Sequence, residues 1–262
     1  MTNTPKISIV MTSYNYAPYI SQAIESIIHQ TYGNWELVIV DDGSKDNSLE
    51  IIKKYCKTDS RIKLYCHKYM KNKGLPATVK LGIKKALYDW IVFLESDDAL
   101  EPSYLEEKIK IIQNEQNVNF IFNDYRAIGD ESFGDEAHHK IFQRNMENRT
   151  GFSNYKNDFY CDNPVPTFSV VMLRKSLLNN INYNTPIKPY LDRFLWGQIA
   201  SKTYFYYIDK PLTLWRKHPA SYMNKKRPKS TILFYLKLGL YLPDIYIKKI
   251  KRFFVLIKIL MG

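Results

Sequence analysis

The sequence predicts an α/β fold in which a mainly parallel sheet is covered by helices on both faces. Strand-like and helix-like segments alternate four times in the first half of the chain. The strand-like segments are continuous apolar runs, as expected of strands buried on both faces, and several of them end in polar clusters. With 262 residues, 45% of them hydrophobic, the chain is long enough to bury a large core.

The first half of the chain is expected to contain four strand–helix units. The expected strands are Ile7 to Thr12, Trp35 to Val40, Arg61 to Cys66 and Trp90 to Leu94. The expected helices are Ala17 to Gln30, Ser48 to Cys56, Leu75 to Tyr88 and a fourth that begins near Pro102. In the first helix the apolar residues recur at helical spacing, and proline suits the first turn of the fourth.

The second half is less regular. Strands are expected at Asn119 to Tyr125, Thr167 to Leu173 and, as one or two strands, Tyr204 to Trp215, with a helix at Tyr190 to Ser201. Residues 129–160 are polar and are expected to be rich in loops. The expected organisation is a first half, residues 1–125, a second half of the same domain, residues 126–220, and a basic C-terminal helical segment, residues 221–262.

The net charge of +12 is concentrated at the C-terminus. Residues 216–262 hold 12 Lys and Arg and one acid, Asp244, which gives +11, so the other 26 bases and 25 acids give only +1. This distribution argues against nucleic acid as a partner of the globular body. The three cysteines are scattered and form no CxxC motif, which favours a reducing, cytoplasmic compartment.

The basic tail alternates cationic residues with aromatic and aliphatic ones. Phe253, Phe254 and Ile257 stand among Lys251, Arg252 and further lysines. This pattern is typical of an interfacial helix on an anionic membrane surface; a helix packed on the body or a dimer contact is the alternative. Since no apolar run reaches about 18 residues, no spanning helix is expected. We expect peripheral attachment to the cytoplasmic face.

Two acidic pairs follow predicted strands, Asp41-Asp42 and Asp97-Asp98. In parallel sheets, ligands bind at the carboxyl ends of the strands. The chain has neither GxxxxGK[ST] nor GxGxxG, so phosphates would be held differently, for example through a Mg²⁺ ion bound by carboxylates. The alternative is that the first pair forms an acidic turn and the second caps a helix.

Three segments together resemble the family 2 glycosyltransferases of the GT-A fold, which is Rossmann-like. They are Ser8 to Asn15 (SIVMTSYN), Asp41 to Ser48 (DDGSKDNS) and Glu95 to Asp98 (ESDD). Their order and spacing match over residues 6–105, and a weaker match continues to about residue 220. The resemblance implies inverting transfer of a sugar from a nucleotide-sugar, expected to be UDP-linked, to an acceptor hydroxyl.

The resemblance also implies a divalent metal, Mg²⁺ or Mn²⁺, on the donor diphosphate and a role in bacterial-type surface polysaccharide or lipid-linked glycan synthesis. A glycan or lipid-linked acceptor is then the expected second substrate. Residues 1–125 would bind the nucleotide-sugar, and residues 126–220 would bind the acceptor and supply the catalytic base.

Carried over residue by residue, the resemblance assigns the nucleotide to the first two segments. Thr12 and Tyr14 would line the base, with Tyr14 stacking on it. Asp42 would hydrogen-bond the base, and Asp41 would lie beside it.

The remaining site residues follow from the later motifs. Asp97 would face the ribose, and Asp98 would bind the metal. Asp192 would be the general base that takes the proton of the acceptor hydroxyl; the alternative is a helix-start acid paired with Arg193. His218 would complete the metal shell or touch the diphosphate, unless it is a solvent-facing histidine at a strand end.

Three departures from the family pattern keep a second class of function open. Glu95 replaces the usual first Asp of the metal motif, Val79-Lys80 replaces the usual Arg-Asn, and Leu191 replaces the Glu before the base. They motivate the alternative of a membrane-tethered, non-catalytic binding protein on a degenerate transferase scaffold. A phospho-receiver domain, a third reading, would need only about half this length.

Overall fold

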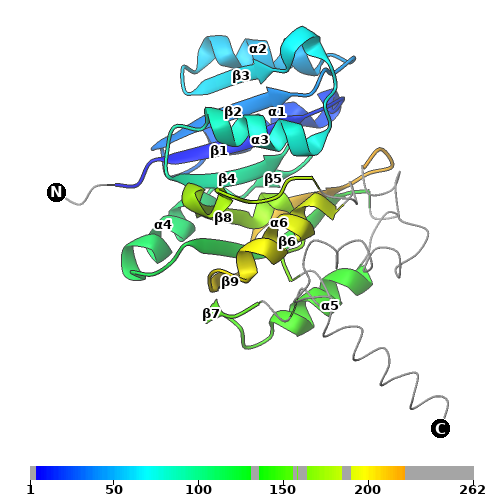
Figure 1. The fold of residues 1–262 in the computed structure, drawn as a ribbon. Coiled ribbons are helices and arrows are strands. Elements are labelled where there is room, and N and C mark those ends of the chain that lie inside the picture. Colours follow the sequence, from blue (N-terminus) through cyan, green and yellow to red (C-terminus); the bar gives the residue numbers. More distant parts are fainter. Residues whose placement is uncertain (1–3, 131–135, 156–157, 159–163, 185–189, 222–262) are drawn as a thin grey trace.

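The computed structural model describes residues 4–130, 136–155, 158, 164–184 and 190–221. Within them the chain forms one nine-stranded sheet with strand order β3-β2-β1-β4-β8-β6-β9-β5, and β7 pairs with β9 outside this path (Figure 1). The predicted α/β class is therefore confirmed.

The first half contains the four expected strand–helix units. They are β1 (Ile7–Ser13), α1 (Ala17–Ile28), β2 (Trp35–Asp41), α2 (Ser48–Thr58), β3 (Ile62–Cys66), α3 (Leu75–Lys85), β4 (Trp90–Glu95) and α4 (Tyr104–Asn114). A 3₁₀ turn, η1 (Lys68–Met70), follows β3, and a two-residue strand, β5 (Ala99–Leu100), lies between β4 and α4. The apolar runs and helical periodicity thus place these elements to within a few residues.

The second half is built from longer strands and fewer helices. Its elements are β6 (Phe120–Gly129), α5 (Glu136–Met146), β7 (Gly151–Ser153), η4 (Phe168–Val170), β8 (Val171–Arg174), η5 (Lys175–Leu178), α6 (Leu191–Ala200) and β9 (Phe205–Lys217). The region at residues 204–215 is one strand, which runs parallel to β6 with a register shift at Asp124.

The direction of strand pairing differs between the two halves. The pairs β1–β2, β1–β4 and β2–β3 are parallel. Strand β8 is antiparallel to both β4 and β6, and β9 is antiparallel to β5 and β7. Strands β1 to β4 therefore pair with one another in parallel, whereas the pairs that involve β5 to β9 are mixed in direction.

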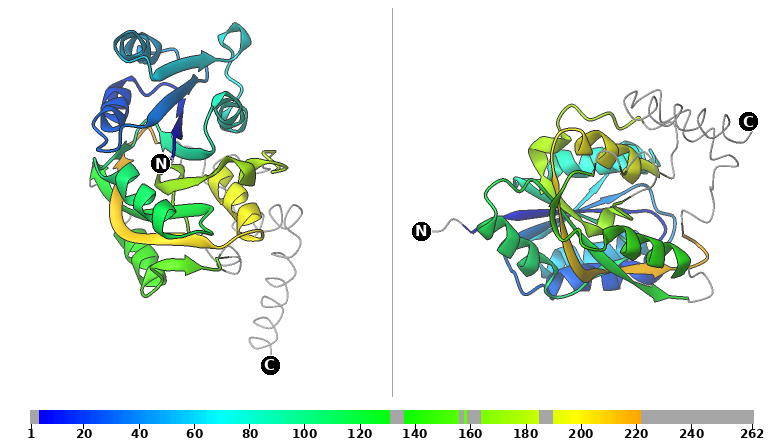
Figure 2. Two further views of the ribbon diagram at one scale, coloured as in Figure 1. Left: turned by 90° about the vertical axis from the view of Figure 1, so that its left-hand side faces the viewer. Right: turned by 90° about the horizontal axis from the view of Figure 1, so that it is seen from below.

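Helices cover both faces of this sheet, as Figure 2 shows from the side. One apolar cluster joins Ile9 and Met11 of β1 to buried residues of α1, α2 and α4. The other joins Val10 of the same strand to Val79 of α3 and Trp196 of α6. Because side chains alternate along a strand, β1 supplies both clusters, and the sheet lies between two helical layers.

Two elements of the second half differ from the elements expected of the sequence. Residues 129–160, which are expected to be rich in loops, also contain α5, whose buried Phe142 and Met146 form too narrow an apolar stripe to stand out among polar residues. The strand expected from Thr167 begins only at Val171, because the Thr167 hydroxyl accepts the Ser169 N–H and caps η4.

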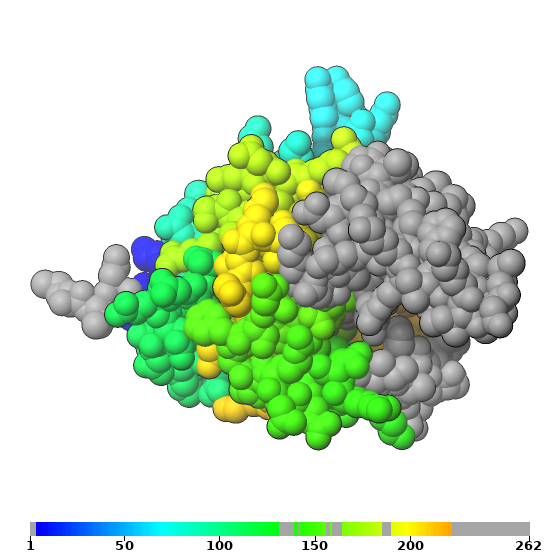
Figure 3. All heavy atoms as spheres, turned by 60° about the horizontal axis from the view of Figure 1, so that its bottom comes forward, coloured from blue at the N-terminus to red at the C-terminus, as the bar shows by residue number. Residues whose placement is uncertain are grey.

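In Figure 3, α6 is visible in yellow beside the yellow-green and green segments.

The predictions for the basic tail lie almost wholly outside the described residues. Within the described ranges, no helix combines the length and apolar character needed to cross a membrane. Membrane attachment of the tail stays a prediction.

Candidate functional site

The polar ends of three neighbouring strands meet at one edge of the sheet. Ser13 at the end of β1 is paired with Asp41 at the end of β2, and Thr12 is paired with Glu95 at the end of β4. The three sequence segments singled out above therefore converge, as expected of strands that run parallel. Thr12 itself stands on the central strand of the three.

Asp41 is buried, and its carboxylate organises the turn that follows β2. Its Oδ1 accepts the N–H groups of Gly43 (3.0 Å) and Ser44 (2.8 Å). Its Oδ2 accepts the hydroxyls of Ser44 (2.6 Å) and Ser13 (3.1 Å). Asp41 thus forms the acidic turn that was one of the two expectations for this pair. Any contact of Asp41 with a nucleotide stays a prediction.

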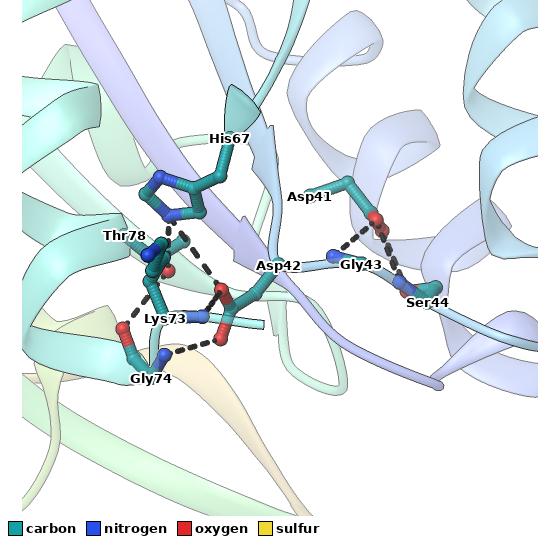
Figure 4. Close-up of polar contacts among 8 residues, drawn as sticks. All are labelled: Asp41, Asp42, Gly43, Ser44, His67, Lys73, Gly74 and Thr78. Atoms are coloured by element: carbon teal, nitrogen blue, oxygen red, sulfur yellow. Dashed lines mark hydrogen bonds and ion pairs between the residues drawn. The ribbon is translucent and has the colours of Figure 1, made fainter. Parts of the chain in front are cut away.

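Asp42 fixes a second loop, residues 67–74, at the same edge (Figure 4). Its Oδ1 accepts the N–H of Lys73 at 2.7 Å and its Oδ2 accepts the N–H of Gly74 at 2.9 Å. The His67 Nε2 lies 3.5 Å from Oδ1 and 3.1 Å from the Thr78 hydroxyl. Because each carboxylate oxygen has two lone pairs, Asp42 keeps acceptor capacity for a ligand.

The Asp41 turn and the loop of residues 67–74 pack tightly against each other at Gly43. This residue has φ +79°, and a Cβ there would lie 2.5 Å from the Met70 carbonyl oxygen. Only glycine meets both conditions without strain. The packing places η1 beside the Asp41 turn, and η1 carries two exposed apolar side chains, Tyr69 (75% exposed) and Met70. With the exposed Tyr14, they provide apolar surface beside the carboxylates.

The second acidic cluster, at the end of β4, has fewer partners. Asp98 is buried, with Oδ2 accepting the Ser169 hydroxyl (2.6 Å) and Oδ1 the N–H of Arg216 (2.9 Å). Glu95 accepts the hydroxyl of Thr167. The alternative that this pair caps a helix is not met, since the residue before α4 is Ser103.

Burial and neighbouring like charges weaken the acidity of these carboxyl groups. Burial, together with the charges of Asp97 and Asp192, raises the pKa of Glu95 to about 8. Burial also raises the pKa of Asp98 well above its ordinary value, helped by the charges of Asp97 and Glu95. Removal from water and nearby like charges both disfavour the charged form of a carboxyl group. Burial and mutual repulsion therefore leave these carboxylates poorly stabilised in their charged form.

Asp97 and His218 form a pair at the mouth of this cluster. The His218 Nε2 lies 3.1 Å from Asp97 Oδ2. The imidazole is buried, with its ring 4.5 Å from the ring of Tyr19, so it is not the solvent-facing histidine that was the alternative. His218, which directly follows β9, thus closes the site from the side of α1.

Asp192 stands in the first turn of α6 and is half-buried. Its charge acts on Glu95, so it lies within electrostatic reach of the acidic cluster. The structure therefore brings the first turn of α6 toward the carboxyl end of β4, although the two segments are nearly a hundred residues apart in the sequence.

Sequence reasoning missed three residues of this site. Arg216 donates from Nε to the carbonyl oxygen of Asp97 (2.7 Å), and its Nη2 contacts Gln22 on α1. The resemblance reached this segment but singled out only His218. Thr167 and Ser169 carry no motif, and they contact acids 71 to 74 residues away, so the sequence holds no signal for them.

The donor set fits a hard divalent cation completed by a ligand. Among the residues that the structure describes, no three His, Cys, Asp or Glu side chains lie close enough to hold an ion alone. Mg²⁺, however, typically takes one or two carboxylates and fills its shell with waters and substrate phosphate oxygens. Asp98, with Asp97 beside it, supplies such a set.

Comparison with known proteins identifies the family. The model of glycosyl transferase family 2 matches residues 8–181. An uncharacterised glycosyltransferase of Rickettsia conorii is 34% identical over 80% of this chain and 33% of its own length. The Escherichia coli protein WfgD, a UDP-Glc:α-D-GlcNAc-diphosphoundecaprenol β-1,3-glucosyltransferase, is 37% identical over 48% of each chain. The chain spans about a third of the length of the first two Rickettsia relatives.

Solved structures show the same fold. Residues 1–349 of TarS of S. aureus in complex with UDP-GlcNAc superpose with a TM-score of 0.71 at 20% identity, over 90% of this chain and 65% of that chain. The Pyrobaculum calidifontis mannosyltransferase PcManGT in complex with GDP-Man and Mn²⁺ gives 0.61 at 16% identity, over 95% and 65%. From the family match and the arrangement of its strand ends, the chain belongs to glycosyltransferase family 2.

Proposed function

We propose that the protein is an inverting, metal-dependent glycosyltransferase that moves a sugar from a UDP-linked donor to an acceptor hydroxyl. The observation that carries this is the cluster of Glu95, Asp97 and the buried Asp98, whose carboxylates repel one another and lie within electrostatic reach of Asp192 at the start of α6. TarS supports a UDP-sugar, PcManGT supports a divalent cation, and WfgD supports a lipid-linked glycan acceptor. The setting is bacterial surface polysaccharide or lipid-linked glycan synthesis.

The donor is held along the strand edge. Tyr14 stacks on the base, Thr12 lines it, and Asp42 hydrogen-bonds it while fixing the loop of residues 67–74 through two backbone N–H groups. Asp41 acts beside it by shaping the turn, and Asp97 faces the ribose.

The diphosphate lies at Asp98, which would hold Mg²⁺ or Mn²⁺, with His218 beside it. When bound, the cation neutralises the charge that develops on the leaving diphosphate. Because this position is screened from water, the attraction between a carboxylate and a cation is stronger than at an exposed site.

Asp192 takes the proton of the acceptor hydroxyl as that oxygen attacks the anomeric carbon. A single displacement of this kind inverts the configuration at the anomeric carbon, because the attacking oxygen approaches opposite to the diphosphate. Residues 126–220 supply this base and the acceptor surface, and residues 1–125 bind the donor. The basic tail, residues 221–262, attaches the enzyme to an anionic cytoplasmic membrane surface, where a lipid-linked acceptor would be found.

A panel of nucleotide-sugars tests the function. Full-length protein is screened for thermal stabilisation with and without Mn²⁺ or Mg²⁺, and the stabilising donor is then incubated to follow nucleotide release and the anomeric configuration of the product. Stabilisation by one donor with metal-dependent turnover and an inverted product is expected. Stabilisation with no turnover on any acceptor tried or on water would favour the non-catalytic binding protein, which the departures at Val79-Lys80 and Leu191 motivate.

A further inference from the structure

The 3₁₀ turn η4 places a buried hydroxyl against the carboxylate that the proposed function gives to the metal. The Ser169 side chain is inaccessible to solvent. Its Oγ accepts the N–H of Glu95 at 3.0 Å and donates to Asp98 Oδ2 at 2.6 Å. One hydroxyl therefore links the end of β4 to the acid three residues further on.

The direction of the hydroxyl hydrogen is set by this arrangement. Because Ser169 Oγ receives the N–H of Glu95 in one of its lone pairs, its own hydrogen points to Asp98. The other carboxylate oxygen of Asp98 accepts the N–H of Arg216. Each oxygen thus receives one hydrogen bond, which fixes the rotation of the carboxylate and leaves each oxygen a free lone pair.

Hydrogen bonds from β9 and α4 hold the η4 turn in place. The Ser169 carbonyl oxygen accepts the hydroxyl of Thr213 on β9 at 3.1 Å. The next carbonyl, that of Val170, accepts the ammonium of the fully buried Lys108 on α4 at 2.8 Å. The neighbouring Thr167 hydroxyl contacts Glu95. Ser169 is therefore anchored to two other elements and cannot swing away from Asp98 without breaking these bonds.

We propose that Ser169 is a positioning residue for the divalent cation, acting by holding the Asp98 carboxylate at one rotation toward the donor diphosphate. The inference rests on the proposed function, which assigns the metal to Asp98. Groups that hydrogen-bond to metal ligands orient them, and their loss typically weakens metal affinity by about 10- to 100-fold.

The same chain offers a matched control at the opposite end of the sheet. Ser8 on β1 is also inaccessible to solvent, donates to Glu36 Oε1 at 2.6 Å and accepts the N–H of Tyr88 at 2.9 Å. It makes the same two hydrogen bonds as Ser169 to a carboxylate and a backbone amide. Ser8 and Glu36, however, stand at the start of β1 and β2, away from the proposed metal.

The test measures Mn²⁺ binding by electron paramagnetic resonance of free Mn²⁺, with full-length protein and saturating UDP. Ser169→Ala is expected to raise the Mn²⁺ Kd at least about tenfold, whereas Ser8→Ala keeps it within about twofold of wild type even if both variants melt at lower temperature. Ser169→Thr, which keeps the hydroxyl, restores most of the affinity. Ser169→Cys, with a weaker donor, gives an intermediate Kd and replaces the alanine variant if that variant does not fold.

Two results would overturn the inference, and they are distinguishable. Normal Mn²⁺ affinity in Ser169→Ala, or an equal loss in Ser8→Ala, would show that Ser169 supports only the fold, with the proposed metal site intact. No Mn²⁺ binding by the wild-type protein with UDP would overturn the metal part of the proposed function and this inference with it.

Discussion

The two acidic clusters at the strand ends differ in how their charge is balanced. Asp41 and Asp42 receive four and two hydrogen bonds respectively from the chain, and Asp42 also lies 3.5 Å from His67. Asp98 receives two, Glu95 receives one from Thr167, and Asp97 lies 3.1 Å from His218, while the charges of Asp97 and Asp192 act on Glu95. The first cluster thus receives more hydrogen bonds for each acid than the second.

This difference separates the acids that fix the loops of the site from the acids that a bound ligand would neutralise. Carboxylates that accept several backbone N–H groups are stabilised in the charged form and rigidify their loops. Carboxylates buried together without cations cost free energy, and such a cost persists where a bound cation offsets it. A close acidic pair in a sequence can therefore serve either purpose, and only the surrounding donors tell the two apart.

The largest effect is expected from Asp98→Asn. Loss of the metal ligand should reduce metal-dependent turnover by about 10³-fold or more, the scale of several kcal/mol of charge stabilisation. The metal-free variant should be as stable as wild type or more stable, since one buried like charge is removed. Steady-state kinetics and urea unfolding without metal check both parts. Wild-type turnover in the variant would contradict the assignment of Asp98.

Asp192→Asn should lower the rate of transfer by about 10²- to 10⁴-fold, the range for loss of a general base. Donor affinity should stay nearly unchanged, because the donor contacts lie at the strand edge. Isothermal titration with the donor and single-turnover transfer separate the two quantities. If donor affinity falls while the transfer rate is normal, Asp192 belongs to the donor site and another group is the base.

Asp41→Asn should behave in the opposite sense to Asp98→Asn. The variant weakens charge-assisted bonds to two backbone N–H groups and two hydroxyls, so the free energy of unfolding should fall by about 2–3 kcal/mol even without metal. KM for the donor should rise because the turn beside Asp42 loosens, whereas Mn²⁺ binding persists. Urea unfolding of the two variants side by side is the measurement. Equal stability changes in both would remove the distinction between the clusters.

The smallest effect on stability is expected from Lys108, a buried basic residue on α4 whose Nζ donates to the Val170 carbonyl oxygen of η4. Burial lowers its pKa well below the ordinary value, so between the two pKa values the folded state binds fewer protons than the unfolded state. Stability should therefore rise with pH across that window and be lowest below it, where both states are protonated. In Lys108→Met, the free energy of unfolding should therefore increase less with rising pH than in the wild-type protein. Urea unfolding at pH 7 and pH 10 checks it, and an unchanged slope would show that Lys108 does not titrate differently on folding.

The first half of the fold was predictable because its signals are local. Continuous apolar runs and helical spacing located β1 to β4 and their helices, and the rule for parallel sheets placed Asp41, Asp42, Asp97 and Asp98 at one edge. The short strands β5 and β7 and the polar helix α5, in contrast, carry too little periodicity to be recognised.

The site was predictable only in part, because its contacts are long-range. The carboxylates are visible in the sequence, but their different surroundings are not. Ser169 lies 71 residues from Asp98, and Arg216 lies 118 residues from it. No pattern in the sequence joins them, since their meeting depends on the antiparallel return of β8 and on the end of β9.

The most direct test of the account is thermal melting of full-length wild-type, Asp98→Asn and Asp41→Asn protein with UDP, before and after Mn²⁺ is added. At about 100 times the Kd, binding should raise the melting temperature of wild type by about 5–10 °C. Asp41→Asn should start lower yet show a similar rise, and Asp98→Asn should start no lower than wild type and show almost none. An equal rise in Asp98→Asn, or no rise in wild type, would contradict the claim that the Glu95–Asp98 cluster is completed by a cation.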